Sequence, residues 1–166
     1  MRIEWKSFRQ EKAIPPEALA SKVNALRKEG KTIATLNGSF DLMHAGHLHI
    51  LFSGSLQADI LIVALNTDKS IQAYKSPDRP IISLENRVDM MAAMACVDYV
   101  TWFDETDPRN ILSIIQPDVH VNGVEYGENC IEAETVKQYG GRIHLVDRIP
   151  GLATSDVIRK IRTLCD

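Results

Sequence analysis

Short apolar runs alternate with helical patterns along most of this chain, and this alternation limits the fold more than any other feature. The run at 59–66, Asp-Ile-Leu-Ile-Val-Ala-Leu-Asn, is almost continuously apolar, which is typical of a strand covered on both faces. Similar runs occur at 32–36, 99–102, 118–122 and 142–146. Strands that alternate with helices form right-handed βαβ units. The sequence therefore predicts an α/β fold, with a single doubly wound, Rossmann-like parallel sheet and helices on both faces.

Periodicity and punctuation residues predict the helices. A helix from Glu17 to Lys28 follows Pro15-Pro16 and stops before Gly30, and Ser83 is placed to cap another helix. The other helices are expected at 44–55, 68–73, 84–95, 108–115, 131–139 and 154–164. Residues 1–15 carry little signal. We expect residues 1–30 to form an N-terminal segment with a helix, and residues 31–166 to form one domain.

Composition excludes several classes of protein. Hydrophobic residues at 45% and charged residues at 25% are those of an ordinary globular protein, and a net charge of −3 argues against a nucleic-acid partner. The first residues resemble no signal peptide, and no apolar run approaches the ~20 residues that span a bilayer. Cys96, Cys130 and Cys165 are odd in number and lack a CxxC pair, which indicates reduced thiols without a disulfide frame or zinc site. We expect a cytoplasmic protein with no membrane partner.

The stretch from 32 to 48 combines a strand, a tight turn and a helix start. The apolar run breaks at Asn37-Gly38 and continues as a helical pattern that carries His44 and His47. A strand that runs through a turn into a helix gathers backbone N–H groups where an anion such as phosphate binds. Two histidines could also be an ordinary surface or core pair. The coincidence of strand, turn, Gly46 and paired imidazoles favours a binding site.

Cations and hydroxyls follow the other strand ends. They are Lys75, Arg79, Arg87, Thr154 and Ser155. Singly, the two loop cations could be solvated, Arg87 could pair with a carboxylate of its own helix, and the hydroxyls could be helix caps. Together they suit substitution at phosphorus, where catalysis is mostly positioning and charge stabilisation. The chain shows no activated nucleophile for acyl transfer, no GxGxxG turn for a dinucleotide and no Walker loop.

The segment 38–47, Gly-Ser-Phe-Asp-Leu-Met-His-Ala-Gly-His, resembles the GxFDxxHxGH signature of the cytidylyltransferase-like nucleotidyltransferases. Further matches follow in the family's order, at 75–80, 85–87, 119–126 and 152–155. The resemblance covers roughly residues 30–163. It implies an enzyme with the HxGH type of Rossmann-like fold.

Within this family the chain is most similar to the adenylyltransferase domain of ADP-heptose synthase, judged by segments 37–41, 65–68, 79–81 and 95–98. His44 separates it from the pantetheine-phosphate adenylyltransferases, which have Thr there. The similarity implies transfer from ATP to a heptose 1-phosphate, with release of pyrophosphate, for the lipopolysaccharide core. That domain is often fused to a sugar kinase. Here it would stand alone, which implies a separate kinase upstream, and a homodimer is a family expectation.

The resemblance also implies a role for each matching residue. His44 and His47 would bond to the triphosphate and stabilise charge at the α-phosphorus. Asp41 would orient a histidine or act through the magnesium shell. Lys75 would hold the nucleotide and acceptor phosphates, with Arg79 as a helper.

Further residues complete the expected site. Arg87, Thr154 and Ser155 would receive the β- and γ-phosphates. The remaining nucleotide or phosphate contacts are expected at Asn37, Gly38, Ser39, Phe40, Asn122, Gly123 and Glu125. Mg²⁺ is expected mainly on the phosphates, so no residue is assigned as a metal ligand.

The chain departs from the heptose enzymes around the base and the acceptor. Where they have Val-Lys-Gly-Gly-Asp-Tyr, this chain has Val-Asn-Gly-Val-Glu-Tyr at 121–126, and Ala153 replaces the first serine of an ISTT turn. Val124 could narrow the base pocket and favour cytosine, whereas the distributed matches favour ATP. Two alternatives therefore stay open: a CTP-dependent cytidylyltransferase acting on glycerol 3-phosphate or a similar phospho-alcohol, and a nucleotide-binding regulatory module without turnover.

Overall fold

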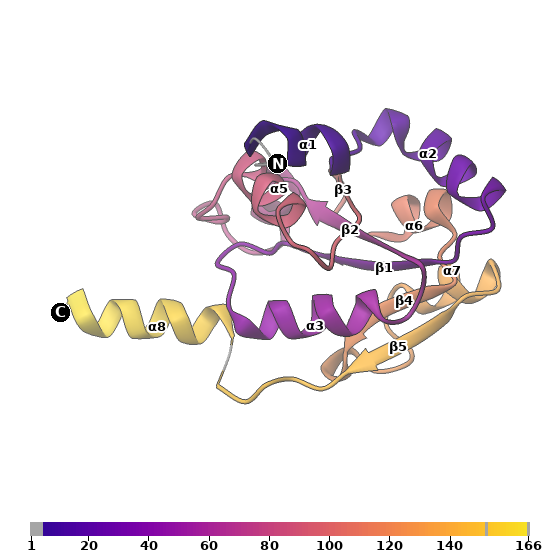
Figure 1. The fold of residues 1–166 in the computed structure, drawn as a ribbon. Helices are drawn as coiled ribbons and strands as arrows, with labels where there is room; N and C mark the ends of the chain where they lie inside the picture. Colours follow the sequence, from indigo (N-terminus) through magenta and orange to yellow (C-terminus); the bar gives the residue numbers. More distant parts are fainter. Residues whose placement is uncertain (1–4, 152, 166) are drawn as a thin grey trace.

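A computed structural model describes residues 5–151 and 153–165, and its centre is a five-stranded parallel sheet (Figure 1). The strands are β1 (Ile33–Gly38), β2 (Ile60–Asn66), β3 (Tyr99–Phe103), β4 (Val119–Gly123) and β5 (Arg142–Val146). They lie in the order β3-β2-β1-β4-β5, and all four pairings are parallel. The predicted α/β fold is confirmed. The strand order reverses between β1 and β4, and ligands of doubly wound sheets bind outside such a point.

The helices lie close to their predicted positions. They are α1 (Trp5–Lys12), α2 (Pro16–Lys28), α3 (Ala45–Ser55), α4 (Asp68–Tyr74), α5 (Leu84–Ala92), α6 (Arg109–Ile115), α7 (Ala133–Gln138) and α8 (Thr154–Cys165), with a 3₁₀ turn at Val124–Tyr126. The sequence analysis missed α1 and extended α5 about three residues too far. Ser83 occupies the N-cap position of α5 but makes no side-chain cap bond; its Oγ accepts from the Asn86 side chain instead.

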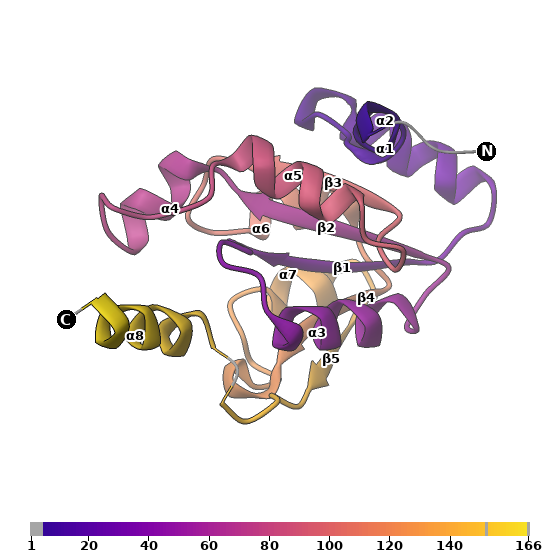
Figure 2. The same ribbon diagram turned by 60° about the vertical axis from the view of Figure 1, so that its left-hand side comes forward.

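Helices cover both faces of the sheet (Figure 2), and an apolar core lies on each face. On one face, Leu51 of α3 and Met91 of α5 pack against inward residues of the strands, such as Leu36. On the other, Leu19 of α2 and Ile115 of α6 pack against a second set. Because side chains alternate along a strand, β1, β2 and β3 supply residues to both cores, and burial of both faces fixes their register.

The N-terminal segment packs onto the second of these cores. Ile14, Leu19, Val23 and Leu26 are buried there. Arg27 at the end of α2 forms an ion pair with Asp118, whose carboxylate also accepts from a backbone N–H of β1. Residues 13–28 therefore share a core with the sheet.

The carboxyl ends of the strands face α4 and α8. In Figures 1 and 2, α8 extends away from the sheet on this side, next to the start of α3. Across the part of the chain that the structure describes, no helix is long and apolar enough to cross a bilayer.

Candidate active site

A cavity of about 450 Å³ opens at the carboxyl ends of the strands. Eleven of the fifteen residues expected to form the site line it: Asn37, Gly38, Ser39, Phe40, His44, His47, Lys75, Asn122, Gly123, Glu125 and Thr154. A neighbouring groove against α8 is lined by Lys75, Arg79, Thr154, Ser155, Ile158, Arg159 and Arg162. Of the expected residues, only Asp41 and Arg87 border neither space. We call the two spaces the main cavity and the basic groove.

The two histidines form the start of α3. His44 is the N-cap, and its Nδ1 accepts from the Gly46 N–H at 3.1 Å. The Nδ1 of His47 accepts from the His44 N–H at 3.3 Å, which completes a reciprocal capping box. Because a backbone donor holds Nδ1 of each neutral ring, the ring proton lies on Nε2. Each histidine therefore keeps an Nε2–H donor for a ligand.

Both rings are neutral at pH 7 in the free protein. Burial, followed by His44 and Lys75, lowers the pKa of His47 to about 4. Burial and the charge of Arg148 also lower the pKa of His44 from its usual value. The ring centroids are 4.0 Å apart, so two imidazolium charges would repel strongly. The pair thus offers two neutral hydrogen-bond donors at a positive helix end.

Lowered histidine pKa values make stability depend on pH. Burial lowers the pKa of His120, a core residue whose Nδ1 bonds to Thr35 at 2.8 Å, to about 3. Between pH 6.5 and about 4 the unfolded chain therefore binds more protons than the native chain at His47 and His120. We expect the free energy of unfolding to fall as the pH is lowered from 7 to 5, measured by urea denaturation.

A His120→Gln variant tests this origin. Gln cannot titrate, so the slope of stability against pH should be shallower than in the wild type. His49→Gln, at an exposed position of α3, serves as the control and should keep the wild-type slope. An unchanged slope in His120→Gln would exclude His120 as a source of the effect.

The turn between β1 and α3 has an unusual backbone. Phe40 has φ of 44°, in the left-handed region that L residues other than Asn and Asp rarely adopt. Its side chain is buried and lies beneath His47, with ring centroids 5.3 Å apart. Non-glycine residues held in this region occur often at binding sites. Here the conformation turns Ser39 toward the cavity and Asp41 away from it.

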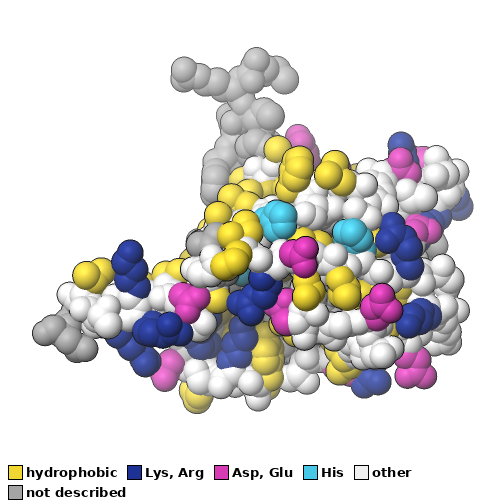
Figure 3. Space-filling view, turned by 90° about the horizontal axis from the view of Figure 1, so that it is seen from below, with side chains coloured by type: hydrophobic (Ala, Val, Ile, Leu, Met, Phe, Trp, Pro, Cys, Tyr) yellow, Lys and Arg dark blue, Asp and Glu magenta, His cyan; other side chains and the backbone are white. Residues whose placement is uncertain are grey.

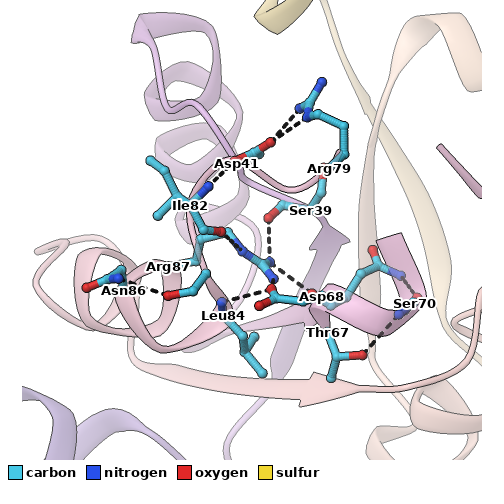
Figure 4. A network of polar contacts seen from close by, with 12 residues as sticks. Ser39, Asp41, Thr67, Asp68, Ser70, Arg79, Ile82, Leu84, Asn86 and Arg87 are labelled. Carbon is cyan, nitrogen blue, oxygen red and sulfur yellow. Dashed lines mark hydrogen bonds and ion pairs between the residues drawn. The ribbon is translucent and has the colours of Figure 1, made fainter. Parts of the chain in front are cut away.

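Asp41 holds the loop that carries Arg79 (Figure 4). Its carboxylate is 1% exposed and accepts from Arg79 Nε at 2.7 Å and from the backbone N–H groups of Ile81 and Ile82. Burial opposes ionisation, but these bonds outweigh it and lower the pKa of Asp41. In this arrangement the carboxylate orients the loop, and the expected role at a histidine or in a magnesium shell stays a prediction. All of these contacts tie Asp41 to residues 79–82.

Arg87 is fully buried rather than exposed to a phosphate (Figure 4). Its guanidinium donates to the carbonyls of Ser39, Asn66 and Ile82 at 2.7–3.0 Å, and to the Asp68 carboxylate at 2.7 Å. These bonds give Arg87 a positioning role in this structure, and the expected phosphate contact stays a prediction. Arg87 ties the ends of β1 and β2 to the loop before α5.

Lys75 borders both the main cavity and the basic groove. Its Nζ donates to Ser39 Oγ at 2.8 Å, and burial with nearby Arg79 lowers its pKa. Basic side chains also gather over α8, the projecting segment at the left of Figure 3. Within the described residues, the arrangement offers neutral donors in the cavity and cations beside it, which suits a polyanion with its reactive phosphorus near His44 and His47.

Comparison with known proteins agrees with this geometry. The model of a family described as cytidylyltransferase-like matches residues 35–160, which include every expected site residue. The chain belongs to this family.

Curated relatives of this family member are bacterial. The chain is 38% identical over 146 residues to the bifunctional protein HldE of Syntrophotalea carbinolica, and 40% identical over 148 residues to that of Geotalea uraniireducens. The alignments cover 87% and 89% of this chain but 30% of each relative, so the chain spans about 30% of their length. These matches confirm the resemblance to the adenylyltransferase domain of ADP-heptose synthase.

Solved structures agree on the fold. A lipopolysaccharide core biosynthesis protein from Thermoplasma volcanium has a TM-score of 0.57 and 24% identity, covering 72% of this chain and 98% of that one. A pantoate-beta-alanine ligase from Francisella tularensis has a TM-score of 0.63 and 15% identity, covering 90% and 72%. These likenesses show that the chain has a Rossmann-like fold.

Arg148 and Glu132 are among the cavity residues that were not expected in the site. Arg148 follows β5 and lies 3.6 Å from Glu125, which it joins in an ion pair at the cavity wall. A basic residue directly after the last apolar run was the available signal. Glu132 is 6% exposed and also lines the cavity, but nothing in its sequence context distinguishes it from an ordinary helix-start residue.

Side chains of the described residues do not by themselves form a metal site. Within residues 5–151 and 153–165, no group of three or more His, Cys, Asp or Glu side chains is placed to hold a metal ion. Asp41, the carboxylate nearest to the motif histidines in sequence, is committed to Arg79 and two backbone groups. The site therefore fits an ion carried by the nucleotide phosphates, because Mg²⁺ keeps most of its ligands as water and phosphate oxygens.

Lys75→Ala is expected to raise the KM of both substrates and to lower kcat. The reason is that one cation borders both anion-accepting spaces, and its removal withdraws charge from each. Steady-state pyrophosphate release with each substrate varied in turn measures the three changes. Lys69→Ala, in helix α4 just before Lys75 and outside both spaces, should behave as wild type. A Lys75→Ala defect confined to one substrate would contradict the shared role.

Proposed function

We propose that this nucleotidyltransferase joins the adenylyl group of ATP to the phosphate of a heptose 1-phosphate, forming ADP-heptose and pyrophosphate. The observation that carries the proposal is the pairing of two neutral Nε2–H donors with Lys75 at the mouth of the basic groove. The donors suit charge that develops at the α-phosphorus, and the groove suits the departing pyrophosphate.

The proposed step needs no general base. A phosphate monoester with a second pKa of ~6 is already ionised at neutral pH, so an oxygen of the acceptor phosphate attacks directly. A new bond forms from that oxygen to the α-phosphorus, and the bond from the α-phosphorus to the bridging oxygen of the β-phosphate breaks. Mg²⁺ on the ATP phosphates would neutralise the charge that the leaving pyrophosphate acquires.

The identity of the nucleotide and the acceptor rests on similarity. Relatives at 36–40% identity are named bifunctional protein HldE, and the chain's motifs resemble the adenylyltransferase domain of ADP-heptose synthase. The reason for favouring CTP loses support in the structure. Val124 is 44% exposed on its 3₁₀ turn and does not line the main cavity, so it does not narrow a base pocket.

The proposal carries expectations about context. The sugar phosphate must come from a kinase-type reaction that phosphorylates the sugar. We expect the protein to act in the cytoplasm, where ATP is supplied. We also propose that residues 31–166 form the nucleotidyltransferase domain, with residues 1–30 as an N-terminal segment, and that the protein acts as a homodimer.

A matrix of substrates tests the function. Pyrophosphate release is measured with ATP or CTP against heptose 1-phosphate or glycerol 3-phosphate, and ATP with heptose 1-phosphate should be fastest. A higher rate with CTP and glycerol 3-phosphate would replace the proposal by the cytidylyltransferase alternative. Nucleotide binding without turnover on any pair would favour a regulatory module.

A further inference from the structure

A buried polar cluster in the main cavity has no part in the proposed transfer chemistry. The carboxylate of Glu132, 6% exposed, lies between two amides: Asn37 Nδ2 is 3.4 Å from Oε1, and Asn122 Nδ2 is 3.4 Å from Oε2. The two asparagines end the neighbouring strands β1 and β4, and Glu132 is the N-cap of α7. All three residues line the cavity.

Hydrogen-bond acceptors outnumber donors in this cluster. Both amide contacts lie beyond the usual range of N–H···O distances, and the Oδ1 of Asn37 is buried without a partner among the described residues. The thiol of Cys130 also contacts Glu132 and Asn122, but a thiol is a weak donor. Buried acceptors of this kind cost free energy unless a donor reaches them. A ligand in the cavity can supply the missing donors.

The chemistry of the cluster selects hydroxyl groups. A phosphate would be repelled by the Glu132 carboxylate. An ammonium group only donates, and would leave the amide N–H groups of Asn37 and Asn122 with their long contacts. A hydroxyl donates to the carboxylate and accepts from an amide at the same time, so neighbouring hydroxyls on one carbon chain can satisfy all three residues.

The position of the cluster separates it from the phosphate-binding groups. Leu36 and Val121 pack in the core under α3, so the alternating side chains of Asn37 and Asn122 point to the opposite face of the sheet, beside α7. His44 and His47 lie on the α3 face. Ile149 and Ala153, on the segment after β5, are apolar cavity residues and offer contacts for a planar base. The polar cluster and the two histidines therefore lie toward opposite faces of the sheet.

We propose that Asn37, Asn122 and Glu132 bind the hydroxyl groups of a polyhydroxylated acceptor whose phosphate is held near His47 and Lys75. This inference rests on the proposed nucleotidyl transfer and adds the residues that recognise the acceptor. It also reassigns Asn37 and Asn122 from the nucleotide to the acceptor.

Glu132→Gln is the test. Gln keeps the shape but replaces one acceptor oxygen by a donor and removes the charge, and bonds to charged groups are strong. We expect the KM for heptose 1-phosphate to rise about tenfold or more, and the KM for ATP to stay within about twofold. Asn122→Ala, which removes one amide, should likewise raise the KM for heptose 1-phosphate and leave the KM for ATP within about twofold. Glu134→Gln, an exposed change two residues further on, is the matched control and should leave both KM values unchanged.

The outcomes separate the inference from the function on which it rests. An unchanged KM for heptose 1-phosphate in Glu132→Gln, or a rise confined to ATP, would overturn the acceptor assignment while the wild-type activity stands. If the wild type does not turn over heptose 1-phosphate, the proposed function fails. The same variants are then titrated calorimetrically with glycerol 3-phosphate, ribitol 5-phosphate and mannose 1-phosphate. Weaker binding to Glu132→Gln of a phosphate that binds the wild type supports the subsite, and binding of none of them, or equal binding, overturns it.

Discussion

Replacing His47 by Ala is expected to lower kcat by about 100-fold or more, with the KM for ATP little changed. His47 keeps an Nε2–H donor because its Nδ1 accepts from the His44 backbone, and its pKa of about 4 leaves the ring neutral. Loss of one preorganised donor to a developing charge costs about 3–4 kcal/mol of transition-state stabilisation. Steady-state pyrophosphate release measures both constants.

His47 also closes the capping box of α3, so a second variant separates the two roles. Glu at the third position of a helix can reach back to the N-cap N–H and offers no donor, so His47→Glu keeps the cap alone. If His47 only started the helix, Glu would restore kcat, and that result would remove His47 from the transition state. His49→Ala, exposed on the same helix, should retain wild-type kcat.

Replacing Arg87 by Leu is expected to lower the free energy of unfolding by about 3–5 kcal/mol. The guanidinium is fully buried, and its loss would leave three carbonyl groups and the Asp68 carboxylate without their donor. The cost comes mainly from the carbonyls, because each buried acceptor left without a donor costs about 1–3 kcal/mol, whereas the Asp68 side chain is 38% exposed and keeps the Leu84 N–H. Urea denaturation with tryptophan fluorescence measures the change.

Arg9 provides the comparison for this prediction. It pairs with Glu85 and Asp89 of the same helix, α5, but its side chain is 39% exposed. Exposed pairs contribute about 0–1 kcal/mol, so Arg9→Leu should destabilise the protein little. Equal losses in the two variants would show that burial of Arg87 is not the source of its effect.

The fold was predictable because the signals are strong and local. Near-continuous apolar runs mark strands covered on both faces, and prolines and glycines mark most of the helix ends. Helix α1 could not be predicted, since its eight residues gain their stability from tertiary contacts such as the bonds of Lys12 to the Met94 and Val97 carbonyls. Short helices depend on such packing rather than on propensity.

The site was predictable as a set of residues but not as a set of roles. Motif spacing identified His44, His47 and Lys75, which the structure brings to one cavity. It did not show that Arg87 is buried, because a cation that anchors a turn and a cation that binds phosphate look alike in sequence. Glu132 was missed because its role depends on contacts that are not local in sequence. It contacts Asn37, which is 95 positions away, and Asn122, which is 10 positions away.

The order of strands in the sheet has a consequence for how the chain folds as it is synthesised. Strand β1 lies at the centre of the sheet, between β2 and β4. The register pair Ile33↔Ile60 puts β2 about 27 residues later in the chain, and the pair Thr35↔His120 puts β4 about 85 residues later. Until β4 emerges, β1 presents an unpaired apolar edge, and such edges are templates for aggregation. The turn that carries both histidines is therefore made early, but the cavity around it closes only when most of the chain has left the ribosome.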